Sequence, residues 1–403
     1  MTASALSGIR VLELGDFVSA PYCARMLADM GADVIKVERP PLGDSSRRYG
    51  PFLDDMPHPE RSGLFLYMNV NKRGVTLDIE KPTGRAILHK LLAQMDVFVM
   101  GLAPREMDAL GLAPATLHAA YPRLIITSLT PYGLTGPYRD RRANDLTCSA
   151  ASGATFLTGR PEREPLTQPC FQADHQCGVS GTAATIAALL MREATGEGQV
   201  ADISETDTMA SIYVGSNVTS SVKEGKDRQR TGIRYPGHYP DGLFRVKDGH
   251  ICLNCPQIVQ WVRFLEAMGA PEWTKDPRYR NRKAMAQEYP DEVDRRMTDM
   301  LKDRTRAELY ALGQERRVPI AMVQTAEDLY RDPHLRARDY FVRLTHAEVG
   351  EREYPGAPYK FSRTPWQARR PAPLLGEHND EVYCGMLGHS RDDLVTLRRA
   401  GVV

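Results

Sequence analysis

The first 130 residues alternate short apolar runs with amphipathic stretches, and this alternation limits the fold more than any other feature of the chain. Four apolar runs rich in Val and Ile lie at residues 9–14, 33–38, 96–100 and 124–130. Their composition is typical of strands buried on both faces. Between them, Pro21 and Pro82 are placed to open helices and Gly31 to close one. Strands that alternate with helices predict βαβ units and a mostly parallel sheet.

A change of composition near residue 222 predicts a second domain. The chain becomes polar there and rich in Gly and Pro, as in a linker, and then predicts a hairpin turning at Asp248 and Gly249. A chain of 403 residues also exceeds the usual size of a single core. We expect an α/β fold whose large domain is formed by residues 1–221 and 319–403, with a smaller domain and its linkers inserted at 222–318.

Composition narrows the classes of function. The formal net charge of +1 gives no overall attraction to nucleic acid or to anionic membranes. No apolar run approaches the roughly 18 residues of a membrane span, and the N-terminus lacks the basic segment of a signal peptide. Seven cysteines in so long a chain predict reduced thiols rather than a disulfide framework. We expect a cytoplasmic enzyme that binds neither nucleic acid nor membrane.

Basic residues gather where the predicted strands end, which is where a parallel sheet binds ligands. The loop at residues 15–21 has one glycine where a dinucleotide fingerprint needs three, and the chain has no Walker motif, which argues against nicotinamide or P-loop chemistry. The basic residues are Arg39, Arg47, Arg48, Lys72, Arg73, Arg139, Arg141 and Arg142. Together they suit a ligand with several phosphates; scattered solvated charge is the alternative.

The segment 172–178, QADHQCG, combines an acid, an imidazole and a thiol. Cys170, His175 and Cys177 are potential zinc ligands, but no distant partner completes the set, so ligand counting disfavours a metal site. A Cys–His nucleophile would need an orienting third group. A second pair, Cys252 and Cys255, falls in an apolar hairpin strand and is predicted to be structural.

Asp174 precedes an apolar, small-residue helix and has two interpretations. In the simpler one it is the N-cap of that helix. In the other, the helix dipole and free backbone N–H groups keep the carboxylate ionised and stabilise an oxyanion beside it, which suits a nucleophile.

A series of ordered motifs extends over nearly the whole chain. They are LSGIRVLEL, MLADMGADVIKVERP, NKRGVTLDI, LTPYGLTGPY, TGEGQVADIS, DGHICL and the closing PLLGEHNDEVYCGMLG. In this order they resemble the family III CoA-transferases, the CaiB/BaiF family. The resemblance implies a Rossmann-like large domain formed by both chain ends, a smaller inserted α+β domain, and a dimer of two interlocked subunits.

The resemblance also implies an acyl-CoA:carboxylate CoA-transferase with Asp174 as its catalytic residue. The carboxylate would attack a donor acyl-CoA, for which succinyl-CoA is a candidate, and give a mixed anhydride and CoA thiolate. The thiolate would then form an aspartyl–CoA thioester, which an acceptor carboxylic acid opens. Each step keeps the energy of a thioester bond, so the reaction needs no ATP, metal or permanently bound cofactor, and the CoA thioester is itself a substrate.

Other site residues follow from the same motifs. Tyr132 matches a family tyrosine near the active site, where it would position an acyl oxygen; ordinary packing beside a strand end is the alternative. Arg39, Lys72 and Arg73 match positions that hold the CoA phosphates.

The chain departs from the family pattern at several places. The family's arginine in the helix after the third predicted strand falls near Ala109, and Arg105, a turn earlier, is available to replace it. Val18 stands where some transferases have a glutamine that contacts the acyl group. Gly237 stands alone where some members have a loop of several glycines over the reacting aspartate, so a glycine lid is in doubt.

Two alternative functions stay open. The first is an acyl-CoA racemase, which needs a His–Asp pair where this chain has Asn144 before Asp145, so one of its two proton-transfer groups is absent. The second is a non-catalytic subunit in a heteromer with a homologous chain, although such a partner tends to lose the aspartate found here at position 174.

Overall fold

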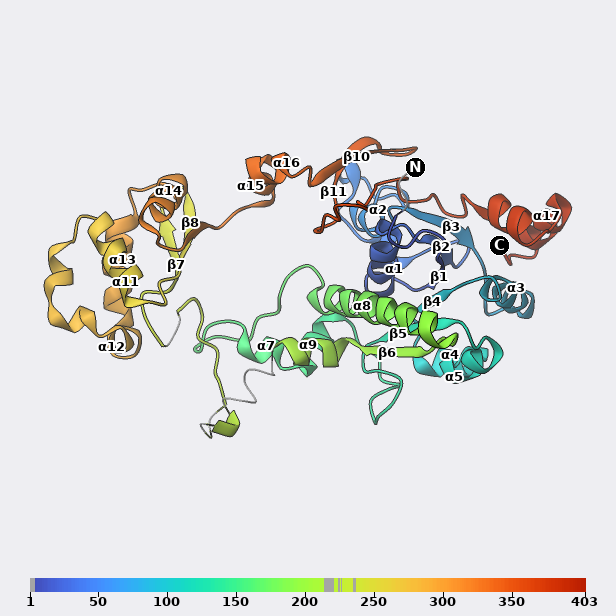
Figure 1. The fold of residues 1–403 in the computed structure, drawn as a ribbon, viewed down its shortest axis with the longest axis horizontal. Helices are drawn as coiled ribbons and strands as arrows, with labels where there is room; N and C mark the ends of the chain where they lie inside the picture. The colour runs from blue at the N-terminus through green and yellow to red at the C-terminus, as the bar shows by residue number, and fades with distance from the viewer. Residues whose placement is uncertain (1–3, 214–220, 224, 226, 235–236) are drawn as a thin grey trace. The chain divides into compact units, whose positions relative to one another are not determined.

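The computed structural model describes residues 4–213, 221–223, 225, 227–234 and 237–403 (Figure 1). The chain forms two compact units. The first comprises Met1–Ala154, Thr167–Glu224 and Arg336–Val403, and the second comprises Thr155–Leu166 and Gly225–Leu335. The return to the first unit at residue 336 lies later than the predicted start of the C-terminal part at 319.

A six-stranded parallel sheet is the centre of the first unit. Its strands are β1 Arg10–Leu14, β2 Asp33–Glu38, β3 Lys72–Thr76, β4 Val97–Met100, β5 Ile125–Thr130 and β6 Val200–Ser204. They are arranged in the order β3-β2-β1-β4-β5-β6, and each neighbouring pair is parallel. This confirms the predicted mixed α/β fold with a mostly parallel sheet, and the order is that of a doubly wound sheet. Lys72 and Arg73 were included among the basic residues at the ends of predicted strands, whereas both lie inside β3.

Helices cover both faces of this sheet. In the first unit they are α1 Ser19–Asp29, α2 Gly63–Met68, α3 Pro82–Leu92, α4 Pro104–Leu110, α5 Pro114–Ala120, α6 Asp145–Ala151, α8 Gln172–Thr195, α9 Glu205–Tyr213 and α17 Arg391–Arg399. The same unit also includes a π-helical segment Asp380–Met386 and the hairpin β10 Phe341–His346 with β11 Gly350–Pro355. The short helix α7 Ala154–Leu157 lies where the chain passes to the second unit, which begins at Thr155.

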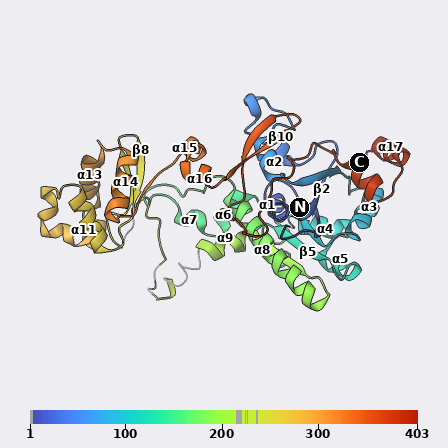
Figure 2. The same ribbon diagram turned by 45° about the horizontal axis from the view of Figure 1, so that its top comes forward.

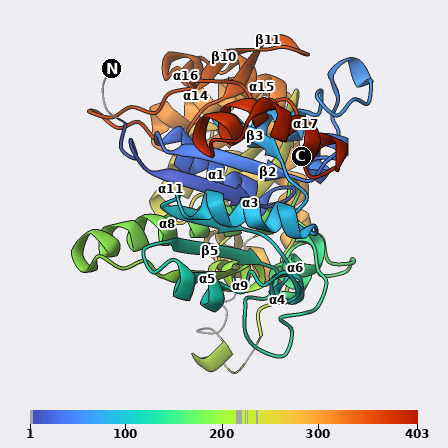
Figure 3. The same ribbon diagram turned by 90° about the vertical axis from the view of Figure 1, so that its right-hand side faces the viewer.

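Alternate strand residues divide between two cores, as buried parallel strands require. Val11 and Val97 pack with α1 and α8, whereas their neighbours Leu12 and Phe98 pack with α3, α5 and α17 on the other face. Figure 3 shows α3 and α17 together on their side of the sheet.

The close packing of α8 against α1 and β5 depends on two glycines. A Cβ added at Gly178 would lie 2.9 Å from the carbonyl oxygen of Ser19 in α1, and one at Gly181 would lie 2.9 Å from the Leu129 side chain of β5. The absence of these side chains lets α8 approach the first turn of α1 and the sheet.

The second unit has a small antiparallel sheet covered by helices. Its elements are β7 Gly242–Val246, β8 Gly249–Leu253, β9 Ile320–Met322, α11 Ile258–Ala267, α12 Arg282–Gln287, α13 Pro290–Leu301, α14 Arg306–Arg316 and α15 Ala326–Arg331, with α16 Pro333–Ala337 where the chain passes to the first unit. The predicted hairpin is confirmed, but its turn is Lys247–Asp248, because Gly249 already pairs with Val246. β9 pairs with β8, which is why residues 320–322 belong to this unit.

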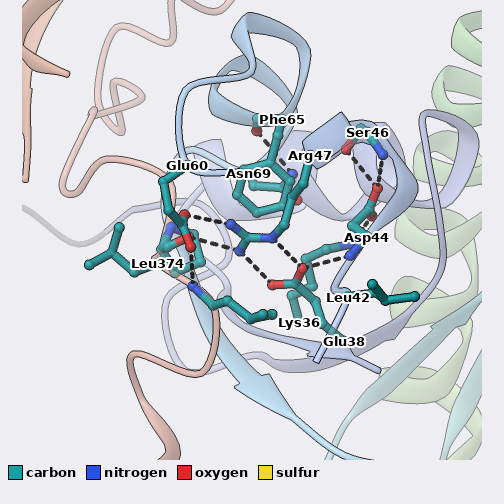
Figure 4. A network of polar contacts seen from close by, with 12 residues as sticks. Lys36, Glu38, Leu42, Asp44, Ser46, Arg47, Glu60, Phe65, Asn69 and Leu374 are labelled. Carbon is teal, nitrogen blue, oxygen red and sulfur yellow. Dashed lines mark hydrogen bonds and ion pairs between the residues drawn. The ribbon is translucent and has the colours of Figure 1, made fainter. Parts of the chain in front are cut away.

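A buried chain of ion pairs connects the strands of the large sheet. The carboxylate of Glu13 on β1 accepts from Lys36 on β2 and from Lys72 on β3, each at 2.7 Å, and Lys36 also lies 2.7 Å from Asp44. All of these side chains are shielded from solvent. Figure 4 shows the part of this network around Lys36 and Asp44.

A buried arginine continues the network. Arg47 contacts Glu38 at 2.7 Å and Glu60 at 2.5 Å, and donates to the carbonyl of Pro373 at 3.1 Å (Figure 4). Arg47 was one of the basic residues considered for phosphate binding, but these contacts occupy its guanidinium.

Loss of one cation from the network is expected to destabilise the first unit strongly. Lys72→Met should lower the free energy of unfolding by about 3 kcal/mol, because removing one partner leaves a buried charge uncompensated. Urea denaturation of Arg39→Met provides the control, since the Arg39–Glu80 pair is solvent-exposed and should be worth less than about 1 kcal/mol. Equal losses in the two variants would contradict a structural role for Lys72.

Candidate functional site

Asp174 lies in the first turn of α8 but is not its N-cap. The cap is Phe171, in the left-handed conformation with φ 53°, and Asp174 is the third residue of the helix. Its side chain is 7% exposed. The capping interpretation is therefore wrong, because the residue that leaves the helical conformation lies three positions earlier.

Four helices begin at this site, and each contributes a polar side chain from its first turn. Ser19 begins α1, Asp145 begins α6 and Glu205 begins α9, beside Asp174 of α8. Figure 2 shows α6, α8 and α9 packed together. The Ser19 hydroxyl lies 2.5 Å from Glu205 Oε1 and 3.3 Å from Asp174 Oδ1. Asp145 Oδ1 accepts from the backbone N–H of Ala173 at 2.7 Å and of Asp174 at 3.4 Å.

Asp145 changes the electrostatics expected for the head of α8. The sequence predicted free N–H groups that could stabilise an oxyanion, but the carboxylate of Asp145 already binds those of Ala173 and Asp174. Asp145 thus serves as the acceptor that Phe171, with its apolar side chain, cannot supply.

Burial and neighbouring acids keep the proton on Asp174. Burial, the charge of Glu205 and the charge of Asp145, in that order, raise the pKa of Asp174 to about 9. The expectation that the helix dipole keeps this carboxylate ionised in the free protein is therefore wrong. A carboxyl group with a strongly raised pKa in a cavity is a candidate for catalysis.

The carboxyl groups open into a cavity of about 500 Å³. It is lined by Asp16, Phe17, Val18, Ser19, Ala20, Tyr49, Gly101, Leu129, Pro131, Ala143, Asn144, Asp145, Leu146, Phe171, Asp174 and Glu205. The rings of Phe17, Tyr49 and Phe171 form an aromatic wall, with centroids 4.8–5.4 Å apart in edge-to-face contact. We call this space the acyl cavity, because the family resemblance implies that an acyl group would bind beside Asp174.

A second cavity of about 500 Å³ lies at the carboxyl ends of β1 to β4. Asp16 and Gly101 line both cavities. The second cavity also contains Arg39, which forms a bidentate pair with Glu80 at 2.8–2.9 Å, and Arg48. Open α/β sheets bind ligands at this edge. We call this space the sheet-edge cavity.

The other predicted phosphate ligands do not line the sheet-edge cavity. Lys72 is fully buried, with Nζ donating to the Pro21 carbonyl and to Asn69 as well as to Glu13. Arg73 is buried between the carboxylates of Asp33 and Glu381. These contacts correct the prediction that Lys72 and Arg73 are available to CoA.

Two further predicted site residues lie at the margins. Arg105 is exposed on α4, one turn before Ala109, which lines the sheet-edge cavity. Tyr132 follows β5 directly after Pro131 of the acyl cavity, and its ring contacts that of Tyr138 at 5.8 Å. Neither residue lines the acyl cavity or the sheet-edge cavity, and their roles stay predictions.

The thiols and imidazole near Asp174 have structural contacts. His175 is hydrogen-bonded to the Phe171 carbonyl and packs on the Tyr22 ring, while Cys177 is buried. In the part of the chain that the structure describes, no three His, Cys, Asp or Glu side chains are placed to hold a metal ion, and no helix is long and apolar enough to cross a membrane.

Ser19 and Glu205 were not singled out from the sequence. Ser19 lies in the loop at residues 15–21 that follows a predicted strand, and Glu205 directly follows β6. A position just beyond the end of a strand is the signal that could have identified both residues, as it identified Arg39.

Asp174→Asn is expected to stabilise the protein increasingly as the pH rises from about 4 to about 9. In that interval the folded state keeps a proton that the unfolded state, with an ordinary pKa of 3.8, releases. At pH 7 the free energy of unfolding of the variant should exceed that of the wild type by about 1–3 kcal/mol, which is the usual cost of one buried polar group without a partner. Urea denaturation at pH 5, 7 and 9 measures it; a difference independent of pH would contradict the raised pKa.

Comparisons with known proteins identify the family of this chain. The profile described as "CoA-transferase family III" matches residues 6–379. The chain is 31% identical to succinyl-CoA–D-citramalate CoA-transferase of Chloroflexus aurantiacus, with 99% of this chain and 98% of the relative covered. It is 33% identical to the beta subunit of succinyl-CoA–L-malate CoA-transferase from the same organism, with 100% and 99% covered.

A solved structure extends the similarity to the fold. A CaiB/BaiF family protein from Brucella suis superposes with a TM-score of 0.86 at 29% identity, covering 96% of this chain and 100% of that one. The chain therefore belongs to CoA-transferase family III, the CaiB/BaiF family, and is an enzyme that transfers CoA.

Proposed function

We propose that this protein is an acyl-CoA:carboxylate CoA-transferase in which Asp174 is the nucleophile. The observation that carries the proposal is the position of Asp174 in the acyl cavity, which shares Asp16 and Gly101 with the sheet-edge cavity. Two such adjacent spaces suit a ligand with a nucleotide head and a long thioester arm.

In this proposal the nucleotide of CoA lies in the sheet-edge cavity and the arm passes Gly101 to the acyl cavity. Arg39 and Arg48 supply cationic donors to the phosphates. The Arg39–Glu80 pair is about 60% exposed on both sides, so water and a phosphate can compete for the guanidinium. Tyr132 and Arg105 are proposed to approach the ligand from the margins of the cavities.

The reaction proceeds through three covalent intermediates on one carboxylate. Asp174 attacks the donor's thioester carbonyl, the C–S bond breaks, CoA leaves as a thiolate, and an aspartyl mixed anhydride forms. The thiolate attacks the aspartyl carbonyl, gives an enzyme–CoA thioester and releases the donor acid. The acceptor carboxylate then attacks this thioester and expels the CoA thiolate, which leaves a second mixed anhydride. The thiolate attacks the acceptor's acyl carbonyl, forms the new acyl-CoA and frees Asp174.

The similar proteins suggest the donor and the assembly. Both Chloroflexus relatives are named for succinyl-CoA, so we propose succinyl-CoA as the donor. One of them is a beta subunit, so we propose two alternative assemblies for this chain: an interlocked homodimer, or a heteromer with a homologous chain. Racemization is disfavoured, because Asn144 caps α6 through Thr147 where a basic histidine would be needed.

Asp174→Asn is expected to abolish CoA exchange, with a loss of at least about a thousandfold, because the amide cannot form the anhydride. Incubation of the wild-type protein with succinyl-CoA and hydroxylamine should modify Asp174, seen by intact mass and peptide mapping. Full exchange activity in the variant would refute the mechanism. A screen of carboxylic acids with the wild-type protein identifies the acceptor.

Arg39→Ala is expected to raise KM for the acyl-CoA about tenfold with kcat within about twofold, because a phosphate contact contributes to ground-state and transition-state binding alike. Arg123→Ala is the matched control, since Arg123 precedes β5 at the opposite edge of the sheet and donates to the Gly196 carbonyl. A fall in kcat with KM unchanged would contradict the assignment. The same assay on Arg105→Ala tests its proposed contact.

A further inference from the structure

One hydroxyl lies between two buried carboxyl groups. Ser19 Oγ is 2.5 Å from Glu205 Oε1 and 3.3 Å from Asp174 Oδ1. A hydroxyl has a single hydrogen, so when it donates to one of these carboxyls it can be hydrogen-bonded to the other only by accepting from it. A carboxyl that donates is protonated, and the geometry therefore accommodates one proton shared by Asp174 and Glu205.

The surroundings favour one shared proton over none. The groups that face the pair are Asp145 and Cys148 of α6, Cys177 of α8 and the Ser19 hydroxyl of α1. Cys148 Sγ donates to Glu205 Oε2 at 3.3 Å and thereby holds the other oxygen of that carboxyl. The side chains that line the acyl cavity in the described part of the chain include no basic one, so no cation compensates two carboxylates there.

We propose that Glu205 stores the proton of Asp174 and, through Ser19, aims a hydrogen-bond donor at the aspartyl carbonyl during the reaction. Before attack, the Asp174 O–H donates to Ser19, and Ser19 donates to Glu205. The proton of Asp174 passes to Ser19 Oγ as that of Ser19 passes to Glu205, so no proton is gained or lost. Asp174 becomes the attacking carboxylate, and Ser19 now donates to Asp174 Oδ1.

The reversed direction of the two hydrogen bonds is what the later steps need. In the anhydride and in the thioester, Asp174 Oδ1 is a carbonyl oxygen that becomes an oxyanion when the thiolate or the acceptor attacks. The backbone N–H groups at the head of α8 already bind Asp145, so Ser19 is a donor that remains for that oxygen. Glu205 acts through Ser19 and is a positioning residue. This inference rests on the proposed function.

The test is the pH profile of kcat for exchange of labelled succinate into succinyl-CoA. Wild-type kcat should fall as the pH passes about 9, where the shared proton is lost. Glu205→Gln should keep kcat at pH 7 within about tenfold and lose that alkaline decline, because an amide can donate to Ser19 at every pH. Ser19→Ala should lower kcat about a hundredfold, the cost of one oxyanion donor.

Ser204→Ala is the matched control. Its hydroxyl donates to the Pro131 carbonyl and accepts from the N–H of Asp207, and it should leave the profile unchanged. An alkaline decline in Glu205→Gln equal to that of the wild type, or a kcat of Ser19→Ala within twofold of the wild type, would overturn the inference. If Glu205→Gln fails to fold by circular dichroism, the Ser19→Ala result decides.

Labelling separates this failure from failure of the proposed function. If no acyl-CoA modifies Asp174 of the wild-type protein in the presence of hydroxylamine, the proposed function itself is wrong. If Asp174 is modified but the profiles of the variants match the wild type, only the role of Ser19 and Glu205 is wrong.

Discussion

The carboxylate of Glu13, shared by two buried lysines, is the interaction on which the site depends. It holds Lys36 and Lys72 on the neighbouring strands, and Lys36 in turn holds Asp44. Asp44 Oδ1 accepts from the N–H of Phe17, which adopts a positive φ of 66°. That backbone turn ends two residues before Ser19 begins α1. These ion pairs therefore hold in place the loop from which Ser19 contacts Asp174.

Buried carboxyl groups are paired with cations in the ion-pair network around Glu13 but not in the acyl cavity. In the network each carboxylate has a cation at 2.7 Å, as buried ions require. In the acyl cavity Asp145, Asp174 and Glu205 have helix N-termini, a hydroxyl and a thiol, but no cation among the described lining residues. The resulting rise in the pKa of Asp174 lowers the free energy of unfolding at neutral pH. The rest of the unit, in which buried charges are paired, can tolerate such a local destabilisation at a functional site.

Much of the fold follows from patterns local in the sequence. The strands β1, β2, β4 and β5 were predicted within a residue or two, because strands buried on both faces are continuous apolar runs. The phosphate ligands were predicted less well. Lys72, Arg73 and Arg39 are all basic residues near the predicted strands, so the sequence does not distinguish them. A charged residue inside a parallel strand must be paired within the protein, whereas a residue just beyond the end of a strand, such as Arg39, reaches the cavity.

The sequence by itself determined the α/β architecture, the helix headed by Asp174 and, through ordered motifs, the resemblance to a CoA-transferase family. Only the tertiary structure decided the state of that aspartate. Its pKa depends on Asp145 and Glu205, and its hydrogen bonds depend on Ser19, residues 29, 31 and 155 positions away in the chain. Electrostatic interactions act through space, so their partners become visible only when separate helix ends are brought to one cavity.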